Sequence, residues 1–225
     1  MTPVQPWTML GLIAWGTLAG LDLVSLLQGL FSRPLIAGAG AGLLLHDPEA
    51  GLRIGLLLEL FALDVLPVGA ARYPDYGPAV VAAVVMVSGT SWSQSLGLAA
   101  LFALGWAALG GWSLQWLRQA NGRALSRNAA GLAAGDPATI ARLQREGLAG
   151  DLVRSLLLTT AGLAVALLLR SHVVLTSRFE PVTAVAIGAG VAAAAGGAIR
   201  SAGRGARLRW LAAGVAIGLL TAILR

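Results

Sequence analysis

The stretch Arg33–Pro78, RPLIAGAGAGLLLHDPEAGLRIGLLLELFALDVLPVGAARYPDYGP, decides the fold of this chain. It contains two apolar runs, Leu35–Leu45 and Leu56–Leu63, on either side of a polar turn around Asp47. A helix needs about 20 residues to cross a bilayer, and each run is shorter than that. Runs of this length are typical of buried or re-entrant helices. We therefore expect the two runs to form a hairpin that enters and leaves the membrane from one side.

The composition is that of an integral membrane protein. Of the 225 residues, 57% are hydrophobic and 12% are charged, whereas soluble domains carry about 25% charged residues. Outside the hairpin, apolar segments that we expect to lie in the membrane occupy Trp7–Leu30, Leu96–Trp116, Ser155–Leu169, Val182–Ile199 and Trp210–Leu224. We therefore predict an all-α fold, a polytopic transmembrane helical bundle with re-entrant or broken helices, forming a single domain over residues 1–225.

Several kinds of chemistry are excluded by the residues that the chain lacks. There is no cysteine, there are only two histidines, and all sixteen basic residues are arginine. Disulfides, thiolate nucleophiles and a Schiff-base lysine are therefore impossible, and a multi-histidine metal site is not expected. We expect no catalytic group, no metal and no cofactor. The net charge of +6 does not indicate nucleic-acid binding, because the arginines cluster between apolar segments, as the positive-inside rule describes.

The segment from Arg118 to Arg154 is the longest polar part of the chain. It carries six arginines, which favours a cytoplasmic location. Asp136 followed by Pro137 is a typical helix start, with the aspartate at the N-cap. We interpret the segment as a cytoplasmic amphipathic linker whose helix lies at the surface or docks a partner. Arg200–Arg209, with four arginines, is expected to form a second cytoplasmic loop.

The most informative single residue is Glu59, which lies inside the second apolar run. A carboxylate within a membrane costs free energy, so it is expected to face the protein interior and to be paired. One reading is a packing salt bridge to Arg53 or Arg72, and the other is a role in substrate binding or coupling. Asp64 lies five residues further on, so the two carboxylates need not share a helix face.

A second candidate region is the loop Gly69–Asp75. It combines small residues with Arg72, Tyr73 and Asp75, and planar hydrogen-bonding groups beside an aromatic ring suit a sugar. The alternative is an ordinary turn with a stabilising pair between Arg72 and Asp75. From the residues alone the two readings remain open.

The same region resembles the membrane subunit IIC of the mannose/fructose/sorbose family of bacterial phosphotransferase sugar transporters. The similarity is ungapped over about forty residues. The matching residues are Arg33-Pro34-Leu35-Ile36-Ala37, Asp47 and Gly51, Gly55-x-x-x-Glu59-Leu60-x-Ala62-Leu63, Val68-Gly69-Ala70-Ala71 and Pro74-Asp75. The segment Arg118–Leu169 fits the family more loosely.

The resemblance implies a sugar permease subunit rather than an enzyme, located in the bacterial cytoplasmic (inner) membrane. Its implied partners are a sister membrane subunit, IID, and the soluble IIA and IIB components that phosphorylate the sugar, with the permease assembled as an oligomer. The residues implied to bind or orient the sugar are Gln28, Glu59, Asp64, Gly69, Arg72 and Asp75.

Two other functions remain open. Pro67 stands where the family usually has an asparagine able to hold a sugar hydroxyl, which favours a membrane scaffold or regulatory subunit that kept the fold without transporting sugar. A membrane enzyme that uses Glu59 and Asp64 is the third hypothesis, and the lack of a nucleophile or metal cluster argues against it.

The arginine content of the two polar segments generates a test of topology. We predict that both lie in the cytoplasm, because ten arginines fall within them. A single cysteine introduced as Ser126→Cys should resist a membrane-impermeant thiol reagent in intact cells and should react after permeabilisation. Ready labelling from outside would contradict the assignment.

Overall fold

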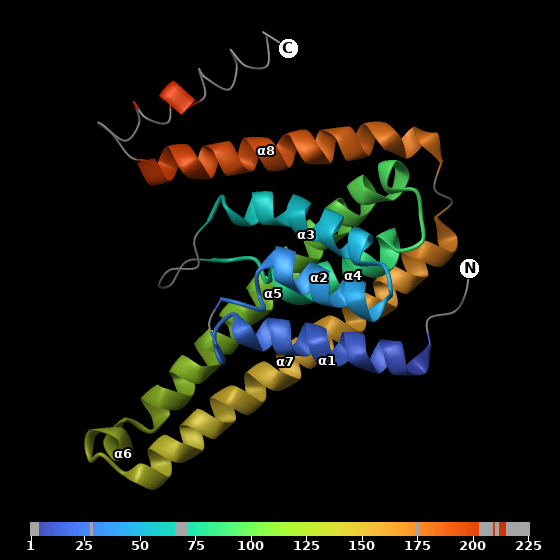
Figure 1. The fold of residues 1–225 in the computed structure, drawn as a ribbon. Helices are drawn as coiled ribbons and strands as arrows, with labels where there is room; N and C mark the ends of the chain where they lie inside the picture. Colours follow the sequence, from blue (N-terminus) through green and yellow to red (C-terminus); the bar gives the residue numbers. More distant parts are fainter. Residues whose placement is uncertain are drawn as a thin grey trace.

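The computed structural model describes residues 5–27, 29–65, 72–173, 176–202, 209 and 212–214, and these residues contain helices but no β-strand. In chain order the elements are α1 (Pro6–Asp22), α2 (Pro34–Leu44), α3 (Pro48–Ala62), α4 (Tyr76–Val87), α5 (Trp92–Arg127), α6 (Ala129–Ala133), α7 (Pro137–His172), the 3-10 helix η1 (Ser177–Phe179) and α8 (Glu180–Ala202). The predicted all-α class is confirmed. Figure 1 shows the short helices gathered around α4, with α8 across one side of the group.

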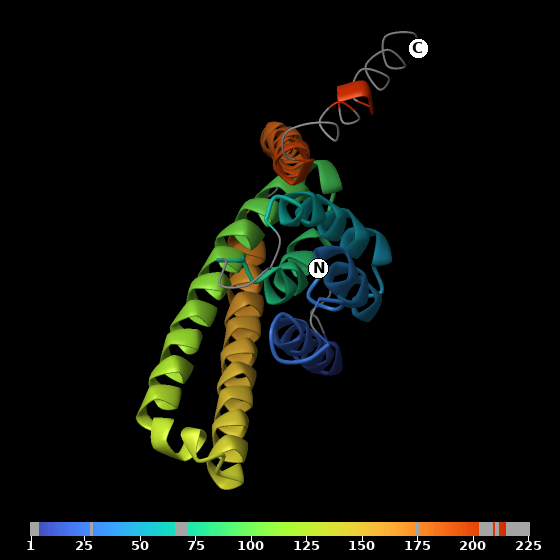
Figure 2. The ribbon, with the colours of Figure 1, turned by 90° about the vertical axis from the view of Figure 1, so that its left-hand side faces the viewer.

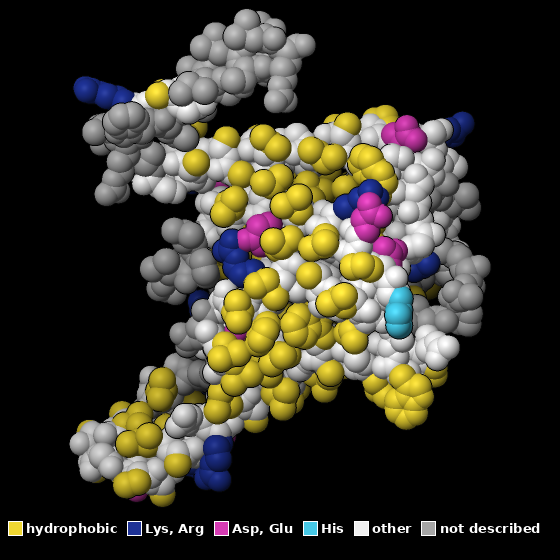
Figure 3. All heavy atoms as spheres, in the orientation of Figure 1, with side chains coloured by type: hydrophobic (Ala, Val, Ile, Leu, Met, Phe, Trp, Pro, Cys, Tyr) yellow, Lys and Arg dark blue, Asp and Glu magenta, His cyan; other side chains and the backbone are white. Residues whose placement is uncertain are grey.

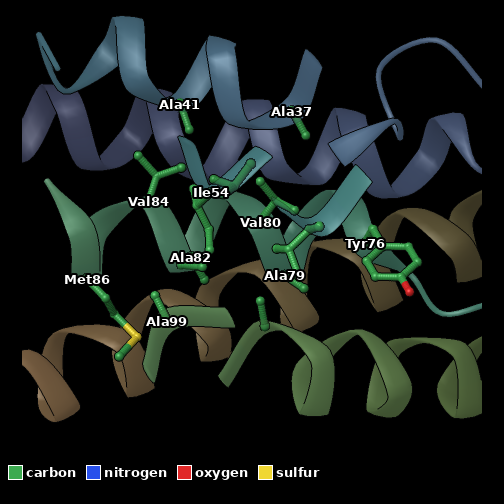
Figure 4. Close-up of a cluster of buried hydrophobic side chains, with 14 of the residues drawn as sticks. Ala37, Ala41, Ile54, Tyr76, Ala79, Val80, Ala82, Val84, Met86 and Ala99 are labelled. Carbon is green, nitrogen blue, oxygen red and sulfur yellow. The ribbon is translucent and has the colours of Figure 1, made fainter. Parts of the chain in front are cut away.

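Helix α4 is the centre of the bundle. All twelve of its residues are buried, and α1, α2, α3, α5 and α7 pack around it. Val80 and Val84 point toward the alanines of α2, and Ala99 of α5 lies on the opposite side of the helix (Figure 4). At about 1.5 Å per residue, α4 is about 18 Å long, which is too short to cross a hydrocarbon core of about 30 Å. A helix that is apolar on every side is therefore shielded by protein on every side.

The expected hairpin is formed by α2 and α3. The N-cap residue of α3 is Asp47, whose Oδ1 accepts a hydrogen bond from the backbone N–H of Ala50 at 3.1 Å. The two helices approach so closely that a Cβ atom on Gly38 would lie 2.5 Å from the carbonyl oxygen of Gly51. Glycine is therefore required at this crossing. The second helix begins at Pro48, eight residues earlier than the apolar run predicted. A re-entrant path through the membrane stays a prediction.

One of the expected segments is shorter in the structure, and another cannot be compared with it. Helix α1 ends at Asp22 rather than near Leu30, and the chain then follows an irregular path to α2 in which Gly29 has a φ of +113°. Glycine adopts that conformation without the steric cost that a side chain adds. The proposed last span, Trp210–Leu224, falls almost entirely outside the described residues.

The polar segment 118–154 does not form a helix of its own, and its role as a cytoplasmic amphipathic linker stays a prediction. Its two ends are continuations of the 36-residue helices α5 and α7, joined through α6. Figures 1 and 2 both show these helices side by side, projecting well beyond the short helices as one long hairpin. The predicted helix start is confirmed, since Asp136 accepts hydrogen bonds from the N–H groups of Ala138 and Thr139. The hydroxyl of Thr139, followed by these N–H groups, holds the pKa of Asp136 below its usual range.

The surface and the helix lengths agree with a membrane location. Three of the described helices are long and apolar enough to cross a bilayer, namely Trp92–Arg127, Pro137–His172 and Ser177–Ser201. Hydrophobic side chains cover much of the face shown in Figure 3. Among the exposed leucines of the chain are Leu43 and Leu56, at 67% and 57%. Apolar surface this extensive is uncommon on soluble monomers and marks a membrane or protein contact.

The close crossing of α2 and α3 predicts a position-specific effect of one added methyl group. Gly51→Ala should lower the thermal unfolding temperature, because the new Cβ meets backbone atoms of Gly38 and Gly42 that cannot rotate away. Gly105→Ala on α5 is the matched control, since no atom lies within 4 Å of its added Cβ and alanine favours a helix. Both can be compared by thermal unfolding of detergent-solubilised protein. Equal stability of the two variants would show that the crossing is not tight.

Candidate functional site

Arg154 on α7 is the centre of a buried network of charges. Its Nη1 donates to Oδ2 of Asp75 at 2.8 Å, and its Nε donates to Oδ1 of Asp151 at 2.9 Å. Asp151 also accepts a hydrogen bond from the hydroxyl of Ser25 at 2.5 Å. The side chain of Arg154 is 8% exposed, while those of Asp75 and Asp151 are 0% and 2% exposed. Buried charges persist only when they are paired, so this network fixes α7 against the residues that precede α4 and follow α1.

Asp22 organises the irregular segment after α1. Its Oδ2 accepts hydrogen bonds from the N–H of Gly29 at 3.0 Å, the N–H of Ser32 at 2.8 Å and the hydroxyl of Ser32 at 2.9 Å. The residue is fully buried. Because backbone N–H groups that leave a helix need acceptors, this carboxylate makes the non-helical path possible inside the bundle.

Glu59 on α3 is paired, as expected, but with a different cation. Its carboxylate forms an ion pair with Arg33 and accepts a hydrogen bond from the N–H of Leu35 at 3.1 Å. The expected partners, Arg53 and Arg72, are wrong. Arg53 pairs with Glu49 one turn earlier on α3 and lies over the ring of Trp92. A spacing of six residues turns Arg53 away from Glu59 on the helix surface.

Tyr73 connects these charged groups. It lies within electrostatic reach of Arg33, Glu59 and Asp75, and its ring packs edge-on against Tyr76 with centroids 5.7 Å apart. The N–H of Asp75 donates to the carbonyl oxygen of Ala107 on α5 at 2.9 Å, which fixes this short extended segment before α4. The segment thus lies between the Glu59 pair and the Arg154 network.

A cavity of about 560 Å³ lies between the segment after α1, Tyr73 and the two long helices α5 and α7. This volume is within the usual range of small-molecule sites. Its polar lining residues are Ser25, Tyr73, Gln115, Arg118, Asn121, Gln144 and Asp151. A smaller pocket of about 240 Å³ adjoins it, sharing Tyr73 and Gln115 with it and adding Arg72. Within the described residues, no cluster of three His, Asp or Glu side chains forms a potential metal site.

The structure separates the residues that the sequence grouped as one site. Glu59 and Asp75 are engaged in ion pairs, and Arg72 lies at the edge of the small pocket. Asp64, at the end of α3, forms an ion pair with Arg200 of α8, and the Asp64 carbonyl oxygen accepts a further hydrogen bond from the same arginine at 2.9 Å. Gln28 and Gly69 lie outside the described residues.

Sequence reasoning missed Arg154 and Asp151. Both were counted as polar residues of a linker, although their i, i+3 spacing and position directly before an apolar span could have indicated a buried pair. Ser25 and the cavity residues of α5 and α7 carry no such signal. Their grouping depends on the long hairpin. It brings residues of α5 and α7 that are about thirty positions apart in the sequence into one wall of the cavity.

Comparison with known proteins identifies relatives. The family model of the sorbose-specific IIC component of the phosphotransferase system matches residues 6–199. The chain is 40% identical over 79 residues to the sorbose-specific EIIC component of Klebsiella pneumoniae, covering 35% of this chain and 29% of the relative. It is 37% identical over 81 residues to the mannose-specific EIIC component of Escherichia coli K12, covering 36% of this chain and 29% of that protein. These alignments therefore span less than a third of either relative's length.

Two solved structures share the fold. One, described only as a membrane protein, has a TM-score of 0.73 at 20% identity, covering 99% of this chain and 94% of the other. The second, the mannose transporter ManYZ in complex with microcin E492, has a TM-score of 0.61 at 21% identity and covers 100% of this chain and 89% of the matched chain. At these identities the likeness establishes the fold alone.

Broken helices, long apolar spans and a buried charge network define an α-helical integral membrane protein. The match over residues 6–199 then gives the family, and the chain belongs to the family described as the sorbose-specific IIC component of the phosphotransferase system. The resemblance seen in the sequence is thereby confirmed.

The Arg154 network predicts a large difference between two arginine substitutions on α7. Arg154→Leu leaves two buried carboxylates without their cation and should lower the free energy of unfolding by about 3–5 kcal/mol. Arg142→Leu is the control, because its ion-pair partner Glu146 is 3.7 Å away and both side chains are at least half exposed. Its hydrogen bond to Oδ1 of Asn128 is exposed as well, so its effect should be small. Thermal unfolding of the purified variants measures both. Similar stabilities would contradict the central role of the network.

Proposed function

We propose that this chain is the membrane-embedded IIC subunit of a mannose-family phosphotransferase system, acting as a single membrane domain in the cytoplasmic (inner) membrane. It moves a sugar across the membrane while soluble IIA and IIB components supply the phosphoryl group, and it assembles with a IID membrane subunit. The single observation that carries the proposal is family membership over residues 6–199. The mannose transporter ManYZ, which has the same fold, supports the choice of a sugar and of a second membrane subunit.

The geometry supports transport in a second way. Charged groups and non-helical backbone inside a bilayer are tolerated where they line a protein-enclosed path, and they mark substrate pathways in transporters. In this chain both the break after α1, through Ser25, and the break before α4, through Tyr73, line the 560 Å³ cavity. We propose that the chain itself does no covalent chemistry, since phosphoryl transfer belongs to the soluble partners.

A scaffold or regulatory subunit remains the second candidate, because one observation favours it. Two of the residues implied to bind sugar, Glu59 and Asp75, are already ion-paired with Arg33 and Arg154. Together with Pro67 in place of the family asparagine, this suits a protein that kept the fold and lost the ligand. The two functions differ in one measurable property, the uptake of sugar.

An uptake assay separates the candidates and tests Glu59. In a strain that supplies IIA, IIB and IID but lacks this subunit, the wild-type chain should restore uptake of labelled mannose or sorbose. Glu59→Leu should reduce uptake more strongly than Glu59→Gln, because the amide still accepts the hydrogen bonds that Arg33 and the N–H of Leu35 donate. Glu49→Leu is the matched control, since it breaks an exposed ion pair of the same helix.

Membrane levels of each variant are measured alongside uptake. Failure of the well-expressed wild-type chain to restore uptake of any sugar tried would favour the scaffold function. Normal uptake by a well-expressed Glu59→Leu variant would show that neither this charge nor its pairing contributes to transport.

A further inference from the structure

The polar residues that line the 560 Å³ cavity include two groups besides Arg118 and Tyr73. Ser25 and Asp151 are held within the Arg154 network. Three other lining residues carry side-chain amides, namely Gln115, Asn121 and Gln144. Within the described part of the chain, these amides have no hydrogen-bond partner. Gln115 and Asn121 are half-buried and Gln144 is exposed, and they come from both arms of the long hairpin. Each amide offers two donors and one acceptor, so this wall of the cavity retains free hydrogen-bonding capacity.

This set of groups suits a neutral sugar. Sugar hydroxyls both donate and accept hydrogen bonds, as amides do, and the buried Tyr73 adds an aromatic surface to the same cavity. A site built of charged groups alone would hold an ion more readily than an uncharged polyol. The carboxylate of Asp151 is already paired with Arg154. The remaining polar groups of the two long helices are the three amides and the guanidinium of Arg118, which can donate to sugar hydroxyls as well.

The position of the cavity along the long helices can be compared with the thickness of a membrane. Gly111, the first cavity residue on α5, is about 29 Å along the helix from Trp92, at about 1.5 Å per residue. Asp151, the last on α7, is about 32 Å from the helix end at His172 by the same measure. Both distances are close to the thickness of the hydrocarbon core of a bilayer, which is about 30 Å. A bilayer that begins at the Trp92 and His172 ends of these helices has its other boundary at the cavity, on the side of the arginine-rich hairpin tip.

A second pocket continues the cavity toward that tip. It measures about 350 Å³, lies between α5 and α7, and shares Asn121, Leu143, Gln144 and Gly147 with the first. Asn121 and Gln144 thus stand at the junction of the two spaces. A ligand that leaves the bundle along the hairpin passes these two amides.

We propose that the cavity between α5 and α7 is a sugar-binding site on the hairpin-tip side of the membrane, in which Gln115, Asn121 and Gln144 hold the hydroxyls of a monosaccharide. The site is separate from the Glu59 and Asp64 ion pairs. It presents the sugar at the face to which the arginine-rich hairpin extends, where a soluble phosphoryl donor has access. This inference rests on the proposed transport function and adds the location and the residues of one binding site.

The chain contains no cysteine, so single-cysteine variants can be made without a background substitution. Gln144→Cys places a thiol in the cavity, and Ser126→Cys places one on the exposed outer part of α5 near the hairpin tip. Each full-length variant is reconstituted in lipid nanodiscs, where both faces are accessible, and its reaction with a cationic methanethiosulfonate reagent is timed. Mannose, sorbose, fructose and glucose are the probes, with glycerol at equal concentration as the control.

A bound sugar should slow modification at Gln144→Cys by about tenfold when its concentration is ten times its Kd, because only the empty protein reacts. The rate at Ser126→Cys should not change. Binding of labelled sugar to the wild-type protein and to Gln144→Cys gives the Kd of each, and the Kd of the variant sets the sugar concentration in its protection assay. Gln144→Leu should weaken this binding about tenfold, whereas Gln119→Leu, on the exposed outer side of α5, should leave it unchanged.

The outcomes distinguish this inference from the function on which it rests. Sugar binding by the wild-type protein without protection at Gln144→Cys, or with unchanged affinity of Gln144→Leu, would overturn the cavity as the site while leaving the transport function standing. Absence of binding of all four sugars to the wild-type protein would overturn the proposed function and the site together. Protection at both cysteines would show a global change and would equally contradict a local site.

Discussion

The pairing of one arginine with two buried carboxylates is the interaction on which the rest of the bundle depends. Arg154 belongs to α7, Asp75 precedes α4, and the same guanidinium also lies 3.4 Å from the Gly20 carbonyl of α1 and from the Ser113 hydroxyl of α5. Four separate segments therefore meet at one cation. Since an unpaired charge in a low-dielectric interior costs several kcal/mol, none of these segments can shift independently without breaking the network.

The short helices are a consequence of this arrangement. Helix α4 starts at Tyr76, directly after Asp75, and cannot reach across a bilayer, so its ends must be satisfied inside the protein. The N–H of Asp75 bonds to Ala107 of α5, and the Gly89 N–H after α4 donates to Asp47 at 2.9 Å. Glycines at the α2–α3 crossing let the surrounding helices approach closely enough to exclude lipid from these polar ends.

The fold class and the hairpin could be predicted from the sequence because they depend on local properties. Apolar content indicates a membrane, run length indicates short helices, and the Asp136-Pro137 pair marks a helix start. The partner of Glu59 could not be predicted, because Arg33 is twenty-six residues away and only the packing of α2 on α3 brings it near. The positive-inside rule assigned Arg154 to a cytoplasmic segment that flanks a membrane span. That rule counts arginines near the ends of spans and does not distinguish exposed arginines from buried ones.

The candidate site shows a related limit of sequence reasoning. A charge in an apolar segment is conspicuous in a sequence, and for the same physical reason it must be neutralised by a partner when the protein folds. Glu59, Asp64 and Asp75 all follow this rule, and each is occupied by an arginine. A group that is to receive a ligand must instead keep its hydrogen-bonding capacity free, which a neutral amide does at much lower cost than a carboxylate. In a helical membrane bundle the charged residues that stand out in the sequence therefore tend to be those that join helices. The recognition groups that we propose are uncharged residues such as Gln115 and Asn121. These residues come together only after the long helices have packed.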